Sequence, residues 1–444
     1  MLSKKKTFTR GIHPPENKSL TETKSIETMP QPEMVIIPLQ QHIGAPSEPI
    51  VNIKDQVKIG DKLSESKGVV SVPSHASISG TVKKIEPCPH PLGVDVLSIV
   101  IETDGQNKLS DAISDEPDYK KLASEEIINR IKNAGIAGMG GATFPTHVKL
   151  SPPPQKKIDT FILNGAECEP YLTADHRLML EYTKDILSGM QLMMQVLNCS
   201  NGFIGIENNK PDAIETMRRV VSESGYKYQV IGFEVKYPQG AEKQLIKACV
   251  NREVPRGGLP MDAGCLVQNV GTAKAVYDAV ARHKPLIDRV VTITGNGIQT
   301  PKNVLVPIGT RFSDVIAFCG GLTDDASKIV NGGPMMGIAQ YTLDVPVIKG
   351  TSGILCLNDA ESKFPDELAC ISCARCVDGC PMGLMPNLLG TYCEYKKFDE
   401  AKQAGILDCI ECGSCAYICP AKRRLVQWIK FGKLEVNRMQ KTAA

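Results

Sequence analysis

Two runs near the C-terminus, CISCARCVDGCP at residues 370–381 and CIECGSCAYICP at residues 409–420, decide the character of this chain. Each run has the spacing C-x-x-C-x-x-C-x-x-x-C-P, which wraps thiolates around a cubane iron–sulfur cluster. Four thiolates also suit structural zinc, but zinc sites usually pair two C-x-x-C knuckles across a longer gap. The spacing therefore predicts two 4Fe–4S clusters and one-electron chemistry.

The pairing of thiols with clusters follows from how such tandem runs bind. In two-cluster proteins of this spacing, the fourth Cys of each run ligates the cluster held mainly by the other run. The first cluster is accordingly predicted at Cys370, Cys373, Cys376 and Cys419, and the second at Cys409, Cys412, Cys415 and Cys380. The N-terminus has no recognisable secretory signal, which favours a reducing, cytosolic compartment where thiolates persist as ligands.

Composition bounds the remaining classes of function. The 444 residues are 42% hydrophobic, enough for several domains with cores of their own. A net charge of +2 gives no general attraction to nucleic acid, and none is expected as a partner. No apolar run approaches the roughly 20 residues of a membrane-spanning helix. We therefore expect any membrane contact to run through partner proteins or a surface segment.

The pattern along the chain predicts a multidomain α+β protein. A basic, extended and poorly packed arm is followed by short β-rich runs typical of a small barrel or sandwich. Next comes an alternation of helix and strand that indicates a parallel, helix-covered sheet, and then the strand–strand–helix–strand order of a β-grasp. Helix-forming residues separate the two Cys runs and predict a helical cluster domain, followed by a basic tail. These segments are residues 1–33, 34–110, 115–285, 287–345, 360–432 and 433–444.

The β-rich segment resembles a biotinyl/lipoyl-type barrel-sandwich hybrid. Residues 57–63 and 78–82 correspond to its two halves. Residues 74–77 read Ser-His-Ala-Ser where such carriers would present their modified Lys. The resemblance implies the scaffold without the swinging arm.

Four stretches within the α/β segment resemble the flavin signatures of the NADH-oxidising flavoprotein subunit of respiratory NADH dehydrogenase. They are GIAGMGGATFPTHVK (135–149), NGAECEP (164–170), YPQGAEK (237–243) and VQNVGT (267–272). The glycine loop follows a predicted helix, whereas an ordinary dinucleotide fingerprint follows a strand. We therefore expect a Rossmann-like flavin domain that is not an ordinary dinucleotide-binding fold.

This resemblance implies a set of residues that contact non-covalently bound FMN and NAD(H). Gly138, Gly140, Gly141 and Lys149 would hold the FMN phosphate and ring edge; Asn164, Glu167 and Glu169 would line the flavin pocket; Tyr237, Gly240 and Glu242 the nicotinamide nucleotide side; Asn269 and Thr272 the flavin phosphate. Taken singly, the three carboxylates also fit a solvated turn or a helix N-terminus. Ala241 and Cys168 depart from the Glu and Ser of the respiratory relatives, which puts nucleotide affinity and flavin potential in doubt.

The full domain order resembles the RnfC family, which belongs to the Rnf complex, an ion-pumping ferredoxin:NAD oxidoreductase. The resemblance implies a peripheral protein at the cytoplasmic face of the membrane. Its partners would be a ferredoxin-like cluster subunit and integral-membrane flavin subunits, and the complex would export Na+ or H+. In this chain FMN would exchange hydride with NAD(H), while the two clusters relay single electrons.

Two other functions remain open at this point. Corrinoid reductases related to this family use similar motifs to reduce cobalamin, although their flavin loop is expected near the N-terminus, not after more than a hundred residues. A non-catalytic relay subunit with a decayed flavin site is the second alternative, which retention of Lys149, Asn164 and Glu242 disfavours. The basic C-terminal segment fits either a lipid- or partner-binding helix or the last helix of the cluster domain.

Overall fold

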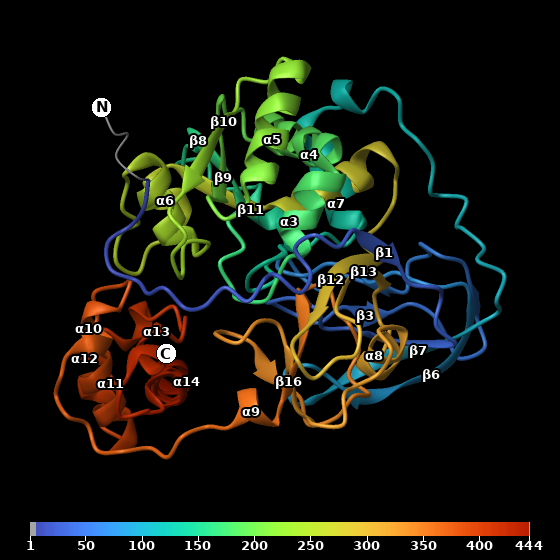
Figure 1. The fold of residues 1–444 in the computed structure, drawn as a ribbon. Coiled ribbons are helices and arrows are strands. Elements are labelled where there is room, and N and C mark those ends of the chain that lie inside the picture. Colours follow the sequence, from blue (N-terminus) through green and yellow to red (C-terminus); the bar gives the residue numbers. More distant parts are fainter. Residues whose placement is uncertain (1–5, 444) are drawn as a thin grey trace.

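The computed structural model describes residues 6–443, which form four domains joined by a long N-terminal arm (Figure 1). The α/β domain lies on one side, and the β-grasp and barrel-sandwich domains lie together on another. The helical cluster domain packs against the α/β domain through several polar contacts described below. This architecture confirms the predicted fold class.

The α/β domain is built on four parallel strands in the order β10-β9-β8-β11. They are β8 (Thr160–Gly165), β9 (Asn201–Glu207), β10 (Gln229–Phe233) and β11 (Cys265–Asn269). Successive strand residues face opposite sides. Phe161 and Leu163 accordingly belong to one core and Ile162 to the other. Apolar residues therefore cover both faces, as a parallel sheet requires.

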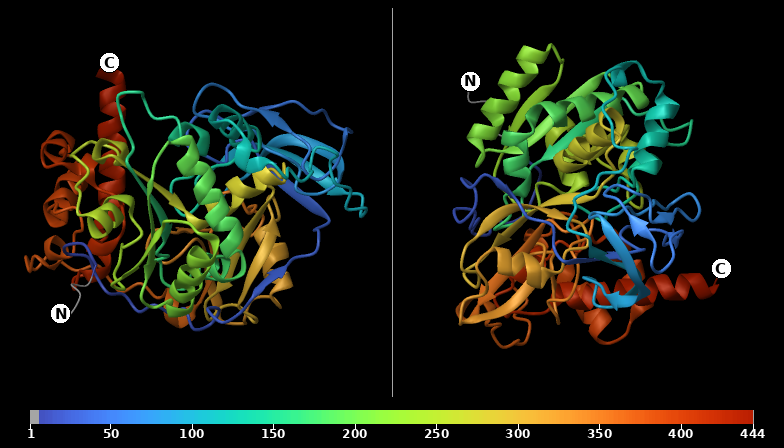
Figure 2. Two further views of the ribbon diagram at one scale, coloured as in Figure 1. Left: turned by 90° about the horizontal axis from the view of Figure 1, so that it is seen from above. Right: turned by 90° about the vertical axis from the view of Figure 1, so that its right-hand side faces the viewer.

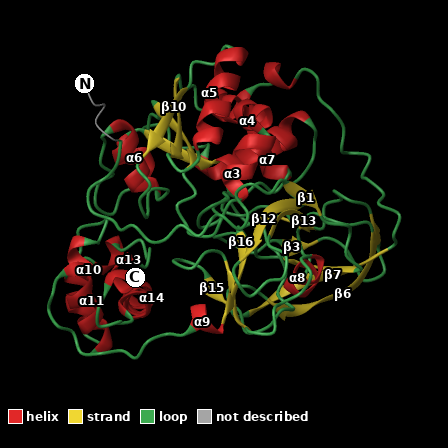
Figure 3. Cartoon of the chain, viewed as in Figure 1, coloured by secondary structure: helices red, strands yellow, loops and turns green. Residues whose placement is uncertain are grey.

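Helices cover both faces of this sheet (Figure 3). They are α1 (Ser124–Asn133), α2 (Thr146–Lys149), α3 (Ala174–Glu181), α4 (Thr183–Val196), α5 (Pro211–Ser224), α6 (Glu242–Val250) and α7 (Val270–Ala281). The single helix expected over residues 174–197 is two helices, because the backbone leaves helical dihedrals at Tyr182 (φ −124°). Helix α6 packs on the face opposite to α3, α4, α5 and α7.

The β-grasp domain is larger than the sequence predicted. Its six-stranded sheet has the order β1-β13-β12-β16-β14-β15. The strands are β1 (Ile26–Thr28), β12 (Asp288–Thr294), β13 (Lys302–Pro307), β14 (Ala326–Asn331), β15 (Ile338–Ala339) and β16 (Gly353–Asn358), with helix α8 (Phe312–Phe318). The expected two strands, helix and strand are present. Strand β16 lies beyond the expected limit at residue 345, and β1 comes from the N-terminal arm.

The barrel-sandwich domain consists of two small antiparallel sheets. Their strands are β2 (Met34–Pro38), β3 (Glu48–Pro49), β4 (Gln56–Val57), β5 (Ser64–Glu65), β6 (Gly80–Pro89) and β7 (Asp95–Thr103). Strand β7 lies between β2 and β6. Val35, Ile37, Ile99 and Ile101 are fully buried and form its core.

The cluster domain repeats one backbone conformation in both Cys runs. Ser372 and Ala374 of the first run have positive φ, as do Glu411 and Gly413 at the corresponding positions of the second. The helices are α10 (Arg375–Asp378), α11 (Pro386–Glu394), α12 (Phe398–Gln403), α13 (Ser414–Ile418) and α14 (Leu425–Ala443), preceded by α9 (Asp359–Ser362). The sequence repeat is therefore a structural repeat.

Helix α14 continues through the segment expected to be a separate tail. Leu425, Ile429 and Val436 are buried against the cluster domain, so this face completes the domain core. The far end of the helix extends away from the body of the protein (Figure 2). Among residues 6–443 no helix is long and apolar enough to span a bilayer.

The prediction that the N-terminal arm is poorly packed is wrong for its described part. Phe8, Ile12, Lys18 and Thr21 are buried. The arm runs along the α/β domain, with Ile12 bonded to Tyr237, and reaches the β-grasp sheet at β1. Its scattered apolar residues find partners in three domains, which local sequence could not indicate. Lys4, Lys5 and Ala444 lie outside the described residues.

Candidate functional site

The predicted flavin residues meet at the carboxyl edge of the parallel sheet. The chain order places β9 and β10 on one side of β8 and β11 on the other, so the strand order reverses between β8 and β11. Ligands of open α/β sheets bind in the crevice at such a switch point. Asn164 at the end of β8 lies in register with Asn269 at the end of β11. We refer to the space beyond these two residues as the switch crevice.

The glycine loop closes one side of the switch crevice. The Thr272 hydroxyl accepts a hydrogen bond from the Met139 amide at 2.8 Å. Gly140 has a φ of +74°, and a Cβ there would stand 2.7 Å from Asn269 Nδ2, so only glycine fits. At Gly141 a Cβ would meet nothing within 4 Å. The loop is thus packed at Gly140 and leaves open space at Gly141, as a cradle for a phosphate requires.

The two Asn side chains fix the backbone around the crevice. Asn269 caps α7 by accepting from the Gly271 amide at 2.7 Å, and it donates to Asp175 Oδ2 at 2.6 Å. Asn164 donates to the Gly240 carbonyl at 2.9 Å and accepts from the Ala166 amide at 3.1 Å. Both amides are therefore fully engaged within the chain and shape the site through their neighbours.

Lys149 and Glu242 form an ion pair across the domain. Lys149 ends the short helix α2 and Glu242 begins α6. Both side chains remain partly exposed. The structure thus brings together a cation from the glycine loop segment and the carboxylate from the predicted nucleotide segment.

Glu167 and Glu169 are not brought together with these groups. Glu167 accepts from the amides of Asp175 and His176, at 2.7 and 3.2 Å, and so caps α3. Glu169 accepts from the amides of Met335 and Met336, at 3.1 and 2.9 Å, in the β-grasp domain. Burial raises the pKa of Glu169 to about 7, although these two amides oppose the rise. The contact of both carboxylates with FMN stays a prediction.

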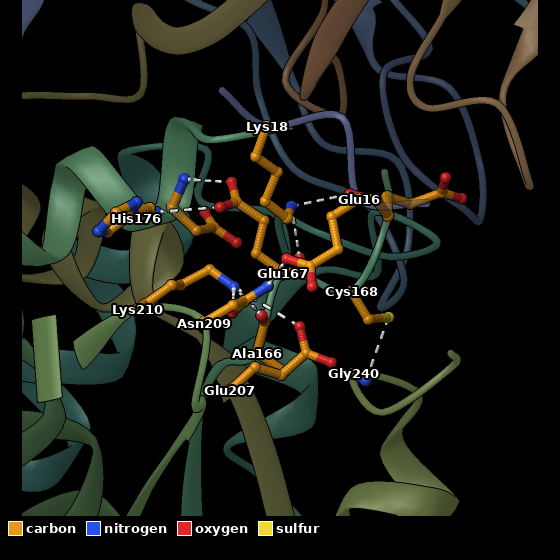
Figure 4. Close-up of polar contacts among 12 residues, drawn as sticks. Glu16, Lys18, Ala166, Glu167, Cys168, His176, Glu207, Asn209, Lys210 and Gly240 are labelled. Atoms are coloured by element: carbon orange, nitrogen blue, oxygen red, sulfur yellow. Dashed lines mark hydrogen bonds and ion pairs between the residues drawn. The ribbon is translucent and has the colours of Figure 1, made fainter. Parts of the chain in front are cut away.

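Two buried lysines hold the loop that carries Glu167 and Glu169 (Figure 4). Lys18 of the arm donates to the carbonyls of Glu167, Glu169 and Leu172, at 3.0, 2.9 and 2.6 Å. Lys210 donates to the Ala166 carbonyl at 2.8 Å. Burial lowers the pKa of Lys18, with the charge of Lys210 acting in the same direction. The motifs could not indicate either lysine, since both lie outside the four flavin-like stretches.

Two glutamines within the predicted motifs have buried amide atoms without a partner in the described structure. Gln268 Nε2 is one, beside Gly138, and both side-chain atoms of Gln239, next to Gly240, are the others. A buried polar group normally has a hydrogen-bond partner. Open space at Gly141 and these unpaired amides fit a polar ligand such as FMN. The motifs contained both glutamines, but sequence could not show that their amides are unpaired.

The first predicted set of cluster thiols lines one cavity. Cys370, Cys373, Cys376 and Cys419 surround it together with Asn387 and Arg423. Cys370 and Cys373 are exposed, whereas Cys376 and Cys419 are buried. The exposed Ile371 and the neighbouring Leu368 give this side of the domain an apolar surface. The fourth thiol of the second run thus lies among the first three of the first run.

The second predicted set lines another cavity. Cys409, Cys412, Cys415 and Cys380 surround it, enclosed by the apolar side chains of Leu389, Val426 and Ile429. Lys433 of α14 donates to the Cys409 carbonyl at 2.8 Å. Burial raises the pKa of the Cys409 thiol to about 11 and also raises the pKa of Cys412. Such thiols lose their protons only when a metal centre binds them.

The arrangement of these thiols bears on the zinc alternative. In the described part of the chain, no three His, Cys, Asp or Glu side chains are placed to hold a single metal ion. Each thiol set instead surrounds a cavity. Donor chemistry and placement therefore fit 4Fe–4S clusters.

Polar contacts dock the cluster domain onto the α/β domain beside the second set. Tyr237 donates to the Cys412 carbonyl at 2.8 Å. Gln244 of α6 donates to the Pro381 carbonyl at 3.2 Å, and Arg256 pairs with Asp408 at 2.5 Å. The second cavity therefore faces the α/β domain.

Known protein families match each part of this description. Residues 6–106 match the RnfC barrel-sandwich hybrid domain, and residues 131–278 match the Nuo51 FMN-binding domain. Residues 290–339 match the SLBB domain, and residues 360–423 match a 4Fe–4S dicluster domain. The predicted FMN and 4Fe–4S cofactors are thereby confirmed at the level of the domain families.

Curated relatives match over nearly the whole chain. The RnfC protein of the proton-translocating ferredoxin:NAD(+) oxidoreductase complex of Clostridium ljungdahlii is 51% identical, covering 97% of this chain and 94% of the relative. The chain belongs to the RnfC family. The RnfC protein of the Na(+)-translocating complex of Acetobacterium woodii is 46% identical, covering 97% of both chains. The RnfC protein of the ion-translocating oxidoreductase complex of Rhodobacter capsulatus is 43% identical, covering 97% of this chain and 83% of the relative.

Solved structures share the RnfC fold of this chain at low identity. An NAD+-reducing [NiFe]-hydrogenase in the H2-reduced state aligns with a TM-score of 0.51 and 17% identity, covering 74% of this chain and 64% of that chain. The air-oxidized state aligns with a TM-score of 0.50 and 18% identity, covering 64% and 55%. These likenesses concern the fold alone.

Proposed function

We propose that this chain is the NAD(H)-reacting subunit of an ion-translocating ferredoxin:NAD oxidoreductase. The observation that carries the proposal is the placement of a flavin-type switch crevice and two four-thiol cavities in one chain, with the second cavity docked against the crevice domain. A hydride carries two electrons, whereas each cluster takes one, so the cofactors between them must convert one regime into the other.

FMN, when bound, supplies hydride exchange with NAD(H) and release of electrons one at a time. The chain's own residues hold it. The open space at Gly141 takes the phosphate, and the Lys149 ammonium contributes a charge-assisted hydrogen bond to an anionic group. Glu242, paired with Lys149, and the neighbouring Gly240 lie on the nucleotide side. Gln239 and Gln268 contribute buried amides that the chain itself leaves unpaired.

Electron balance suits two clusters. One NADH yields NAD+, one proton and two electrons, and each cluster takes up one of these electrons. The two thiol sets, Cys370, Cys373, Cys376 and Cys419 and then Cys409, Cys412, Cys415 and Cys380, are proposed as the cluster ligands. The exposed thiols of the first set make that cluster the point of exchange with a partner.

The partners follow from the family. The relatives are named as subunits of ferredoxin:NAD(+) oxidoreductase complexes that translocate protons or Na+. We propose that a ferredoxin-like cluster subunit and integral-membrane flavin subunits bind this chain at the cytoplasmic face of the membrane. Ion export would then belong to those partners. Copurification of the tagged chain with membrane subunits tests this assembly, and a chain that leaves washed membranes free of them contradicts it.

The electron-transfer proposal is tested on the full-length chain purified without oxygen. We expect bound FMN, two clusters by iron content and electron paramagnetic resonance (EPR), and reduction of both by NADH. Cluster reduction with ferricyanide as the final acceptor must then proceed at the expense of NADH. Clusters without bound flavin would show the relay alternative, and rapid reduction of cobalamin with NADH would show the corrinoid reductase alternative. Either outcome would overturn the proposal.

A further inference from the structure

We propose that Tyr237 is the positioning residue that fixes the second cluster at electron-transfer contact with the flavin domain. This inference rests on the proposed function and adds a residue-specific route to it. The sequence resemblance placed Tyr237 on the nucleotide side of the flavin. In the structure its hydroxyl points the other way, to the backbone of a cluster ligand.

The contact between Tyr237 and the cluster domain is direct and buried. The hydroxyl donates to the Cys412 carbonyl at 2.8 Å, and the residue is only 1% exposed. Ile12 of the arm and Cys412 form one buried cluster with it, and Met335 and Cys168 pack against this cluster. Water is therefore excluded from the hydrogen bond, which makes the loss of its donor costly.

The other end of the same segment reaches the switch crevice. Gly240 lies three residues after Tyr237, accepts from Asn164 Nδ2 at 2.9 Å and donates to Cys168 Sγ at 3.3 Å. Hydrogen bonds from the Gln239 amide to the Lys236 carbonyl and from the Ala241 amide to the Pro238 carbonyl hold this segment as a compact turn. A short covalent path thus leads from the crevice wall to the Tyr237 hydroxyl and, across one hydrogen bond, to Cys412.

The β-grasp domain locks this joint from the side. Glu169 fixes the Met335 and Met336 amides, and its carboxylate lies beside the Tyr237 hydroxyl. The Met335 carbonyl lies against Gly413, where a Cβ would stand only 2.8 Å away. Gly413 immediately follows Cys412 and has a φ of +79°. Three domains therefore converge on the backbone of one cluster ligand.

The first cluster has no equivalent joint in the described structure. By the repeat of the two runs, Cys373 corresponds to Cys412, yet Cys373 is exposed whereas Cys412 is buried. The asymmetry assigns the order of the relay. Electrons from NADH reach the second cluster first, each reducing it by one electron, and pass to the first cluster, while NAD+ and one proton leave.

The test compares two tyrosines that lose only a hydroxyl. In Tyr237→Phe the ring still fills its site, but the Cys412 carbonyl loses its donor. In the control Tyr171→Phe, the lost bond joins the Tyr171 hydroxyl to Glu361 Oε1 at 3.0 Å, an α/β-to-β-grasp contact away from the clusters. Anaerobic stopped-flow mixing with NADH follows flavin bleaching and cluster reduction separately.

We expect Tyr237→Phe to keep wild-type flavin and iron content and an unchanged rate of flavin bleaching. Cluster reduction should slow about five- to tenfold, the factor that loss of one buried hydrogen bond represents. Tyr171→Phe should leave both rates unchanged. Wild-type cluster reduction in Tyr237→Phe would overturn the inference while leaving the proposed function intact. A wild-type chain without flavin or clusters would instead overturn the proposed function.

A second measurement does not depend on turnover. Dithionite reduction followed by EPR resolves the two clusters at equilibrium. Tyr237→Phe should alter the spectrum and lower the reduction potential of the second cluster alone, because a dipole that stabilises the added electron is removed. A change confined to the first cluster, or no change in either, would contradict the assigned order.

Discussion

Asn164 and Asn269 lie opposite each other in register at the carboxyl ends of β8 and β11. Each side chain is fully engaged within the chain, Asn164 with Gly240 and Asn269 with Gly271 and Asp175. These bonds connect all four flavin-like motifs, since Gly140 also packs on Asn269. The pair therefore holds the switch crevice open as a single preformed unit.

Asn269→Ala should weaken both the fold and the flavin site. The change removes the cap of α7 and the donor to Asp175, and loss of an N-cap costs about 0.5–2 kcal/mol. We expect a lower free energy of unfolding in urea and loss of most bound FMN on gel filtration. Asn201→Ala is the control, because Asn201 begins β9 at the opposite edge of the sheet and donates to the Asp159 carbonyl. Equal flavin loss in both variants would show that the crevice is not the site.

Gly140→Ala and Gly141→Ala should separate packing from ligand contact. At Gly140 the methyl group meets Asn269 and the backbone is left-handed, which costs about 1–2 kcal/mol for a residue with a Cβ. Gly140→Ala should therefore lower the unfolding temperature of the flavin-free protein. Gly141→Ala should leave that temperature unchanged, yet weaken FMN affinity, because the methyl group enters the open space. Wild-type FMN affinity in Gly141→Ala, measured by fluorescence titration, would place the phosphate elsewhere.

Cys419→Ala should damage the first cluster although Cys419 belongs to the second run. The thiol lies in the cavity of Cys370, Cys373 and Cys376. We expect the EPR signal lost in Cys419→Ala to be the one lost in Cys370→Ala, with the other signal retained. Cys393→Ala is the control, since this buried thiol of α11 lines neither cluster cavity. A Cys419→Ala spectrum that matches Cys409→Ala would show that each run ligates its own cluster.

The sequence predicted features that depend on local spacing and missed those that depend on distant contacts. The Cys runs specify repeated turns, so both thiol sets could be predicted before the cavities were seen. Strand β1 could not, because Ile26 pairs with Asn303 far along the chain. The flavin-like motifs identified the loop of Glu167 and Glu169, but not where the carboxylates point. Helix α3 and the β-grasp backbone determine those directions.

A third kind of joint lies where the barrel-sandwich domain meets the glycine loop. The Lys349 ammonium is fully buried and donates to the carbonyls of Pro73 and Gly135, at 2.8 and 2.7 Å. Burial lowers its pKa to about 7. The neighbouring His75 is also buried, which lowers its pKa to about 3, so it stays neutral above pH 5. The charge of Lys349 is therefore the variable element of this joint near neutral pH.

The stability of the protein should rise with pH above 7 because of Lys349. Between its folded pKa of about 7 and its unfolded value of 10.5, the unfolded chain binds more protons than the folded one. The free energy of unfolding then increases with pH, by at most about 1.4 kcal/mol per pH unit. Lys349→Met should remove this slope in urea titrations from pH 7 to 9. Lys274→Met should retain the slope, because the pairing of buried Lys274 with Asp278 raises its pKa despite burial. Equal slopes in wild type and Lys349→Met would show that Lys349 is protonated throughout.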